Sequence, residues 1–351
     1  MTKTERFFAF TARATWLLCA GVVVLGAYVR LTDAGLGCPD WPGCYGEILV
    51  PTDHAAANAA YPERPLETGK AWREMIHRYF ASGVGLGILL LLVSGWRQRL
   101  APRGFLLGLF ALVCFQGLLG AWTVTWQLKP LAVSAHLLGG MATLGLLSWL
   151  NLGYLARRPA PPAPARMPAF AAVALLVLFG QIFLGGWTSS NYAALACPDF
   201  PTCHAQWWPK ADFAEAFVLW RGLEQNYEYG VLDSPARTAI HLTHRLGAIV
   251  ATLVLGALAW ALWRAAGWRR WGAALGAALL AQVLIGISTV ELGLPLAVAT
   301  AHNAGAAVLI VLLFGLNARL RGASAAASPR AAASPGAAAS PGARLRGGAD
   351  G

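Results

Sequence analysis

Residues 169–189 read AFAAVALLVLFGQIFLGGWTS and contain no charged side chain. A helix of about 20 apolar residues is long enough to cross the hydrocarbon core of a bilayer. Comparable apolar stretches recur along the chain, and each predicts a transmembrane helix. The eight predicted spans lie near residues 14–31, 76–95, 104–126, 131–154, 169–189, 239–263, 271–292 and 296–317. The sequence therefore predicts an all-α integral membrane protein.

The composition and the placement of charge agree with a membrane location. The 351 residues are 57% hydrophobic and 12% charged, and about 25% charge is usual in a soluble domain. The net charge of +11 could suit a nucleic-acid partner, but the acidic residues gather in two predicted loops, 32–73 and 190–237, and many basic residues lie at the opposite ends of the spans. Those basic residues are Lys3, Arg6, Arg13, Arg97, Arg99, Arg103, Arg157, Arg158, Arg166, Arg264, Arg269, Arg270, Arg319 and Arg321.

This asymmetry follows the positive-inside rule. It predicts a multi-pass protein of the cell (inner) membrane with both termini in the cytoplasm. We therefore expect the lipid bilayer, and no nucleic acid, as the partner of the basic ends.

The chain also repeats itself, with a nearly constant separation between the two copies. Gly26 and Gly185 each precede a loop that contains two cysteines, and three further pairs of segments follow in the same order. The pairs are CPDWPGC at 38–44 with CPDFPTC at 197–203, EMIHR at 74–78 with HLTHR at 241–245, and AH at 135–136 with AH at 301–302. Such self-similarity indicates a duplicated structural unit. We predict two tandem, pseudo-symmetric four-helix bundles.

These landmarks divide the chain into five segments. We expect a cytoplasmic N-terminus at 1–13, a first four-helix half at 14–155, a Pro/Ala-rich linker at 156–168, a second half at 169–317 and a tail at 318–351. The tail repeats Ala-Ser-Pro units without hydrophobic anchors, and such composition predicts disorder on the cytoplasmic side.

Four histidines lie near the outer starts of the even-numbered predicted helices. They are His77, His136, His244 and His302. An ionisable residue at the edge of the hydrocarbon costs up to about 3 kcal/mol, so its presence there favours a functional role. Two histidines at equal depth on neighbouring helices can bind one haem iron from opposite faces, and the repeat predicts two such pockets. Plain packing histidines are the alternative, and zinc is disfavoured because the spacing lacks a local cluster of four ligands.

The neighbours of these histidines suggest further roles. Arg78 and Arg245 directly follow two of them, and they could pair with haem propionates or extend to headgroups and loop acids. Glu74 and His241 precede the same two histidines by three residues and share their helix face. The Glu74 carboxylate could move protons or stabilise a developing cation, whereas His241 could support a ligand or remain as a relic of the repeat. This difference predicts different tasks for the two pockets.

Two cysteine pairs lie in the predicted outer loops: Cys38 with Cys44, and Cys197 with Cys203. An oxidising outer compartment permits disulfides. Closing so short a loop would contribute only about 2 kcal/mol. The pairs are therefore interpreted either as loop staples or as redox-active thiols.

Three predicted helices share a pattern that places glutamine four residues before glycine. The copies are QGLLG at 116–120, QIFLG at 181–185 and QVLIG at 282–286. Small residues allow helices to approach closely in lipid, and a glutamine can form a hydrogen bond across the interface. We interpret the pattern as helix packing.

In combination, these motifs resemble those of the haem A synthase family, over roughly residues 14–317. The resemblance rests on eight helices in two halves, the Glu74-x-x-His77-Arg78 segment, the Ala-His136 and Ala-His302 helices, His244-Arg245 and the paired loop cysteines. It implies an oxygen-dependent oxidoreductase that converts a methyl group of haem O to a formyl group. Two successive hydroxylations would give a geminal diol, which loses water to give haem A.

The resemblance also implies a division of labour between the halves. His244 and His302 would hold haem b as a cofactor, while His77, His136 and Glu74 would act on haem O. Cys38 and Cys44 form the pair to which the resemblance gives a redox role. Implied partners are the farnesyltransferase that produces haem O, a membrane electron donor and, as an open case, a second copy of the chain.

Three rival functions remain compatible with parts of the sequence. A bis-histidine cytochrome would use the same histidines and only pass electrons. A thiol–disulfide exchange protein would use the outer cysteines alone. A transporter would also contain tandem repeats, but its polar site usually lies at the midplane of broken helices, whereas these histidines lie at one edge.

Overall fold

The computed structural model describes residues 2–156, 159–223 and 225–326. Within these ranges it contains eight helices that are long and apolar enough to cross a membrane. They are α1 (Lys3–Leu31), α3 (Thr68–Gln98), α4 (Arg103–Thr125), α5 (Pro130–Trp149) with its π-helical extension η1 (Leu150–Tyr154), α6 (Met167–Ser190), α8 (Ser234–Arg264), α9 (Arg269–Glu291) and α10 (Leu296–Ala326). Two short helices, α2 (His54–Ala60) and α7 (Phe213–Ala216), lie in the long loops. The predicted all-α membrane fold is confirmed.

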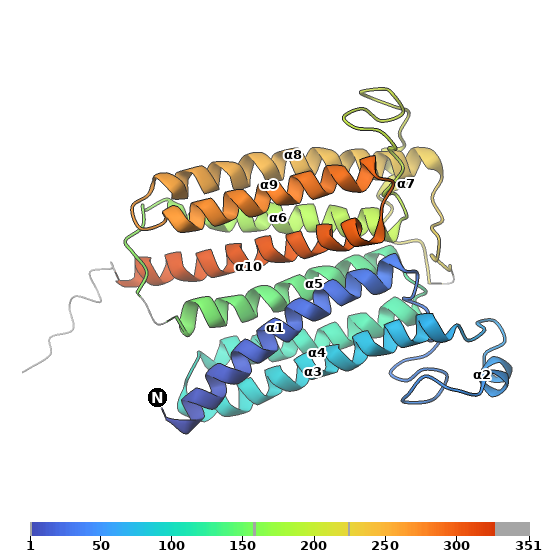
Figure 1. Ribbon diagram of the computed structural model, residues 1–351, viewed down its shortest axis with the longest axis horizontal. Coiled ribbons are helices and arrows are strands. Elements are labelled where there is room, and N and C mark those ends of the chain that lie inside the picture. The colour runs from blue at the N-terminus through green and yellow to red at the C-terminus, as the bar shows by residue number, and fades with distance from the viewer. Residues whose placement is uncertain (1, 157–158, 224, 327–351) are drawn as a thin grey trace, which may run out of the picture.

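The eight long helices form two groups side by side (Figure 1). One group contains α1, α3, α4 and α5, and the other contains α6, α8, α9 and α10. α5 and α10 meet in the middle, where the ring of Phe314 covers Gly145 so closely that an added Cβ would lie 2.3 Å from it. A single buried apolar cluster, which includes Leu144 and Leu313, extends through both groups. The arrangement is consistent with tandem four-helix halves that share one core.

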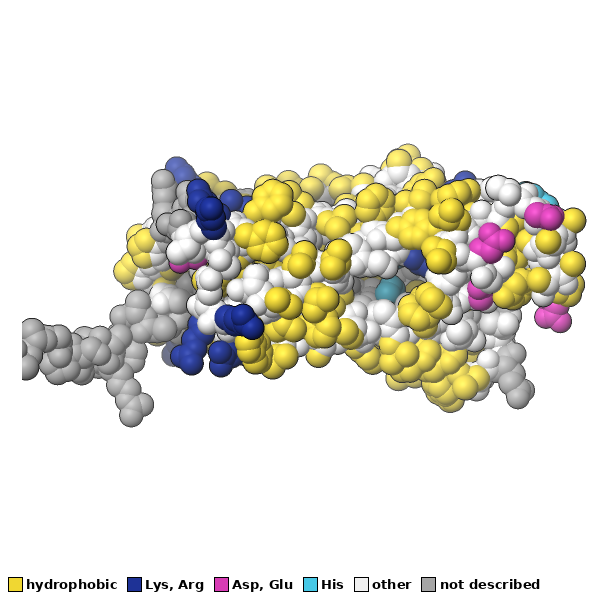
Figure 2. Space-filling view, turned by 90° about the horizontal axis from the view of Figure 1, so that it is seen from below, with side chains coloured by type: hydrophobic (Ala, Val, Ile, Leu, Met, Phe, Trp, Pro, Cys, Tyr) yellow, Lys and Arg dark blue, Asp and Glu magenta, His cyan; other side chains and the backbone are white. Residues whose placement is uncertain are grey.

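Charge is distributed along the long axis of the molecule as the sequence predicted. Lys and Arg side chains gather at one end and Asp and Glu side chains at the other, with hydrophobic side chains between them (Figure 2). At the basic end, Arg103 lies 5.0 Å from the ring centre of Trp96, and Arg269 lies 4.7 Å from that of Trp263. Such pairs of aromatic and basic residues suit the boundary between lipid and water.

Several helices extend beyond their predicted apolar ranges. α1 begins at Lys3 behind a capping box, in which Thr2 and Glu5 exchange hydrogen bonds of 3.1 and 2.9 Å, and α10 continues to Ala326. Hydropathy detects only the apolar part of a helix, whereas backbone hydrogen bonds continue into the polar boundary. Residues 318–326 of the predicted tail are therefore helical. Residues 327–351, and Arg157 and Arg158 of the linker, lie outside the described residues.

The two outer loops join the halves at the acidic end. Arg64 of the first loop pairs with Glu228 of the second at 3.1 Å. Arg30 at the end of α1 donates a 2.7 Å hydrogen bond to the carbonyl oxygen of Ser189 in α6. The outer ends of the two halves are thus tied together by charge-assisted hydrogen bonds.

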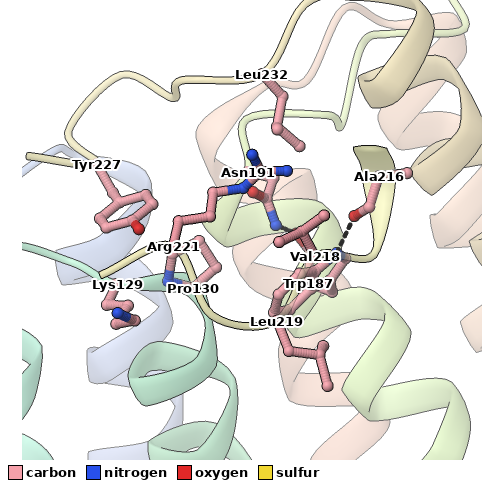
Figure 3. Close-up of a pocket in the computed structure, with 10 residues that line it drawn as sticks. All are labelled: Lys129, Pro130, Trp187, Asn191, Ala216, Val218, Leu219, Arg221, Tyr227 and Leu232. Carbon is pink, nitrogen blue, oxygen red and sulfur yellow. Dashed lines mark hydrogen bonds between the residues drawn. The ribbon is translucent and has the colours of Figure 1, made fainter. Parts of the chain in front are cut away.

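A buried lysine lies at the same junction (Figure 3). Lys129, which precedes α5, is 1% exposed. Its Nζ donates to the carbonyl oxygen of Gly222 and lies 3.4 Å from the ring centre of Trp220. A buried ammonium needs such partners, so Lys129 fastens the second outer loop to the first half.

The contact between the halves leads to a stability prediction. Gly145→Ala would place a methyl group inside the van der Waals radius of Phe314. Overpacking of this kind should lower the free energy of unfolding by about 1–3 kcal/mol, measurable by thermal unfolding of the purified protein in detergent. Gly140→Ala on the same helix is the matched control, because its Cβ meets no atom within 4 Å. Equal melting temperatures for the two variants would contradict this packing.

Candidate functional site

Each of the four histidines rests on a glycine of the preceding long helix. His77 lies on α3, His136 on α5, His244 on α8 and His302 on α10. A Cβ at the facing glycine would lie 3.0 Å from His77 (Gly26), 3.4 Å from His136 (Gly120), 3.3 Å from His244 (Gly185) and 2.8 Å from His302 (Gly286). Glycine allows this close approach because it has no side chain. The four rings therefore occupy equivalent places in their helix pairs.

The two histidines within each half lie on helices at opposite corners of the four-helix unit: α3 and α5 each pack against α1 and α4, and α8 and α10 each pack against α6 and α9. The sequence had predicted neighbouring helices, and the two histidines instead face each other across the unit. The side chains of His77 and His136 are close enough to interact electrostatically, and so are those of His244 and His302. On the face shown in Figure 2, a histidine side chain is visible at the bottom of a hollow. The predicted pairing within halves is thus compatible with the positions of the rings.

Glu74 is buried, and it faces the cysteine loop. Its Oε2 accepts a 2.9 Å hydrogen bond from the backbone N–H of Cys38, and its Oε1 accepts one of 2.5 Å from Arg78. His241 holds the equivalent position in the second half, where its Nδ1 lies 3.0 Å from the carbonyl oxygen of Ala193 and 3.4 Å from the backbone nitrogen of Cys197. Both residues therefore contact the backbone of an outer loop from the same helical position.

The two arginines also bind these loops. Arg78 donates to the carbonyl oxygens of Asp40 and Pro42, at 3.0 and 3.2 Å, and to that of Gly43. Arg245 donates to Thr202, Cys197 and Asp199, at 2.7, 3.1 and 2.8 Å. The structure thus shows both guanidinium groups engaged with loop carbonyl oxygens. Their role as propionate partners stays a prediction.

The cysteine loops are built alike in the two halves. Disulfides join Cys38 to Cys44 and Cys197 to Cys203. In the second loop, Asp199 accepts hydrogen bonds from the Thr202 hydroxyl and from two backbone N–H groups. The Thr202 bond in particular lowers the pKa of Asp199 below its usual value. The loop therefore keeps a carboxylate at its turn.

Three glutamine amides touch the histidines, which the sequence analysis did not predict. Gln116, Gln181 and Gln282 lie beside His136, His244 and His302 respectively. The sequence pattern predicted helix packing in which the glutamine can form a hydrogen bond across the interface, but it did not predict a histidine as the partner. The repeated spacing between glutamine and glycine was the available signal, but the partner side chain lies on another helix.

Comparison with known proteins assigns the chain to a family. The family model described as "Cytochrome oxidase assembly protein" (COX15-CtaA) matches residues 10–314. The heme A synthase of Shewanella oneidensis is 45% identical over 313 residues, which cover 87% of this chain and 94% of that protein. Those of Rhizorhabdus wittichii and Erythrobacter litoralis are 31% and 32% identical, over 86% of this chain and 92% and 94% of theirs.

The chain belongs to the haem A synthase family. This confirms the resemblance seen in its sequence motifs. The sequence match covers all eight long helices in whole or in large part, from α1 to α10. This member of the family is a multi-pass helical membrane protein.

The histidine sites fit the axial positions of a haem better than a site for a free metal ion. Within the described ranges, no group of three or more His, Cys, Asp or Glu side chains could hold a metal ion. A haem iron already has four porphyrin nitrogens and needs only one or two axial ligands. Nδ1 of His77 is buried without a hydrogen-bond partner among the described residues. Paired imidazoles on facing helices are a suitable donor set for a haem.

The arginine contacts predict that α3 and α8 stabilise the two disulfide loops through Arg78 and Arg245. Arg245→Leu removes three charge-assisted hydrogen bonds to the second loop, each worth about 1.5–3 kcal/mol. Amide hydrogen exchange over residues 197–206 should accelerate at least about tenfold. Arg97→Leu, an exposed arginine at the opposite end, is the control. Unchanged exchange in the Arg245 variant would show that the loop is held by other contacts.

Proposed function

We propose that the chain is a haem A synthase that oxidises a methyl group of haem O to a formyl group. The observation that carries the proposal is the duplicated pair of histidines, each seated on a glycine, in a chain that closely matches heme A synthases over most of its length. The methyl carbon loses four electrons in two successive hydroxylations, and the resulting geminal diol loses one water. Dioxygen supplies the oxygen, and an external donor supplies the electrons for its activation.

The two halves take different haems in this proposal. His244 and His302, in residues 169–317, would hold haem b, which would supply electron transfer when bound. His77 and His136, in residues 14–155, would hold the substrate haem O. The difference between Glu74 and His241 supports this division, because only the first half places a carboxylate one turn before a ligand.

Glu74 is the proposed catalytic residue. Its carboxylate is fixed by Arg78 and by the N–H of Cys38, so it can stabilise positive charge that develops at the edge of the substrate ring. The same contact connects the pocket to the Cys38–Cys44 disulfide. A redox role for that disulfide remains part of the proposal, and Cys197–Cys203 is assigned as a staple of its loop.

The proposal places the protein in the inner membrane with both termini in the cytoplasm. The basic end in Figure 2, which is the end that holds the start of α1 and the end of α10 in Figure 1, supports this orientation. The histidines then lie toward the outer side. Haem O would arrive from its farnesyltransferase within the bilayer.

Pigment analysis tests the function directly. The protein is produced together with a source of haem O, purified, and its non-covalently bound haems are extracted and separated by chromatography. We expect haem b and haem A in the wild-type preparation. Haem b with unmodified haem O, in membranes that contain active reductants, would favour a cytochrome that only passes electrons. A preparation without any Soret band would refute both haem-based functions.

The division of labour predicts the phenotype of Glu74→Ala. This variant should retain haem b in the second half while haem A formation falls about a hundredfold, within the range of losses for a group that stabilises charge in the transition state. Glu67→Gln, which changes an exposed carboxylate just before the same helix, is the control and should form haem A normally. Loss of all bound haem from the Glu74 variant would contradict the assignment of separate pockets.

A further inference from the structure

The two disulfide loops contain the same tight turn. Residues 44–47 and 203–206 each form an antiparallel bridge between their first and last members. Both central residues have positive φ, 56° and 81° in the first loop and 55° and 58° in the second, as in a type I′ hairpin turn. An aspartate, Asp40 or Asp199, accepts hydrogen bonds of 2.6–3.0 Å from the two central N–H groups. Both loops therefore have the same backbone conformation at the turn.

Two large apolar side chains follow each turn and are exposed. Ile48 and Leu49 are 82% and 58% exposed, and Trp207 and Trp208 at the equivalent positions are 77% and 65% exposed. We call these four residues the loop tips. The residue after them is buried in both loops. Among the described residues, the apolar clusters that contain the disulfides include none of the loop tips. The folded loops therefore leave these side chains available to contact another surface.

The tip of the first loop lies beside the membrane-spanning part of α3. The hydroxyl group of Tyr79 donates a 2.6 Å hydrogen bond to the carbonyl oxygen of Ile48. Tyr79 lies two residues beyond His77, inside the predicted apolar span 76–95. The next residue, Phe80, is 50% exposed, and an exposed apolar side chain on a membrane-spanning helix faces lipid. The apolar surface of α3 thus continues directly onto the tip of the loop.

The second loop lies against α8 at the equivalent depth. The guanidinium carbon of Arg245 lies 5.6 Å from the ring centre of Phe200 in the loop, and the residue after it, Leu246, is 49% exposed. Trp208 stacks with Phe213, with 5.9 Å between the ring centres, which enlarges the apolar surface. Figure 1 shows this loop projecting sideways near the outer end of α8, whereas the first loop lies at the opposite edge of the molecule beside α3.

A lipid surface explains these features better than water or a protein partner. Adjacent large apolar side chains are unusual on a surface that faces water, but such residues are common where headgroups meet hydrocarbon. The apolar character is present in both copies although the residues differ, Ile-Leu in one and Trp-Trp in the other. A single docked protein would not contact opposite edges of the molecule, whereas a bilayer surrounds it on all sides.

We propose that the loop tips insert into the leaflet of the bilayer at the acidic end of the molecule. Each disulfide loop would then be fixed on two sides. Arg78 or Arg245 binds its backbone from the helix, and the loop tip anchors it in lipid. This inference adds an interaction surface to the molecule and does not depend on which haem either half binds.

Photo-crosslinking from the loop tips tests the inference. A p-benzoylphenylalanine side chain at position 48 or 207 inserts on irradiation into C–H bonds of whatever molecule lies beside it. In vesicles of phosphatidylcholine and phosphatidylglycerol, we expect phospholipid adducts at both positions, detected by mass spectrometry of the loop peptides. Position 63 is the matched control, because Glu63 is exposed in the first loop and closely follows α2, which lies beyond the helix ends in Figure 1. No lipid adduct is expected there.

A second measurement uses the unsubstituted chain and decides the question if a benzoylphenylalanine variant does not fold. The protein is reconstituted with phosphatidylcholine that carries a diazirine in its acyl chain, and the labelled residues are mapped after irradiation. We expect label in residues 45–51 and 204–210, and none in residues 61–67.

Three results would overturn the inference. One is cross-linking of positions 48 and 207 to a second copy of the chain, or to another protein in native membranes, in place of lipid. Another is the absence of lipid adducts from both tips. The third is an equal yield of lipid adducts at position 63 and at the tips, since the tips would then not be distinguished from a remote part of the loop.

Discussion

The contact between an imidazole and a glycine of the neighbouring helix is the constraint on which the rest of this structure depends. It occurs four times, at Gly26, Gly120, Gly185 and Gly286, and it sets both the depth of each histidine and the distance between two helix axes. An added Cβ would lie 2.8–3.3 Å from the ring at Gly26, Gly185 and Gly286, so the ring or the helix would have to shift, whereas the 3.4 Å at Gly120 is an ordinary van der Waals contact. Because lipid provides little hydrophobic force between helices, close packing of this kind also holds the bundle together.

The outer loops extend this arrangement above the helices. Glu74 and Arg78 in the first half, and His241 and Arg245 in the second, bind loop backbone within one turn of a proposed ligand. The carboxylate in the first half and the imidazole in the second make this contact with the loop backbone with different charge.

The two halves are similar in architecture but not in chemistry. They share the glycines that contact the histidines, the disulfide loops and the arginines bound to those loops. Among the described residues, His77 is the one of the four histidines without a glutamine amide beside its ring. The half that contains His77 is also the half with Glu74 in place of His241.

The sequence alone determined the number of spans and the residues that repeat, and it predicted the orientation of the spans. Long apolar runs and the placement of arginines depend only on local composition, and the EMIHR and HLTHR segments align without any knowledge of contacts. The resemblance carried by these segments was confirmed by the comparisons, while the roles of the individual histidines remain predictions. The sequence placed the end of the last apolar span near residue 317 and did not show that its helix continues to Ala326.

Only the tertiary structure decided which side chains meet. Gln181 and His244 are separated by more than sixty positions in the chain, and the glutamine pattern by itself predicted helix packing without identifying the histidine as the partner. Arg78 and Arg245 were predicted to pair with haem propionates or to extend to headgroups and loop acids, and the structure adds that both donate hydrogen bonds to loop carbonyl oxygens. The physical reason is that a helical sequence shows which residues share a face, but the rotation and depth of its neighbour determine what that face touches.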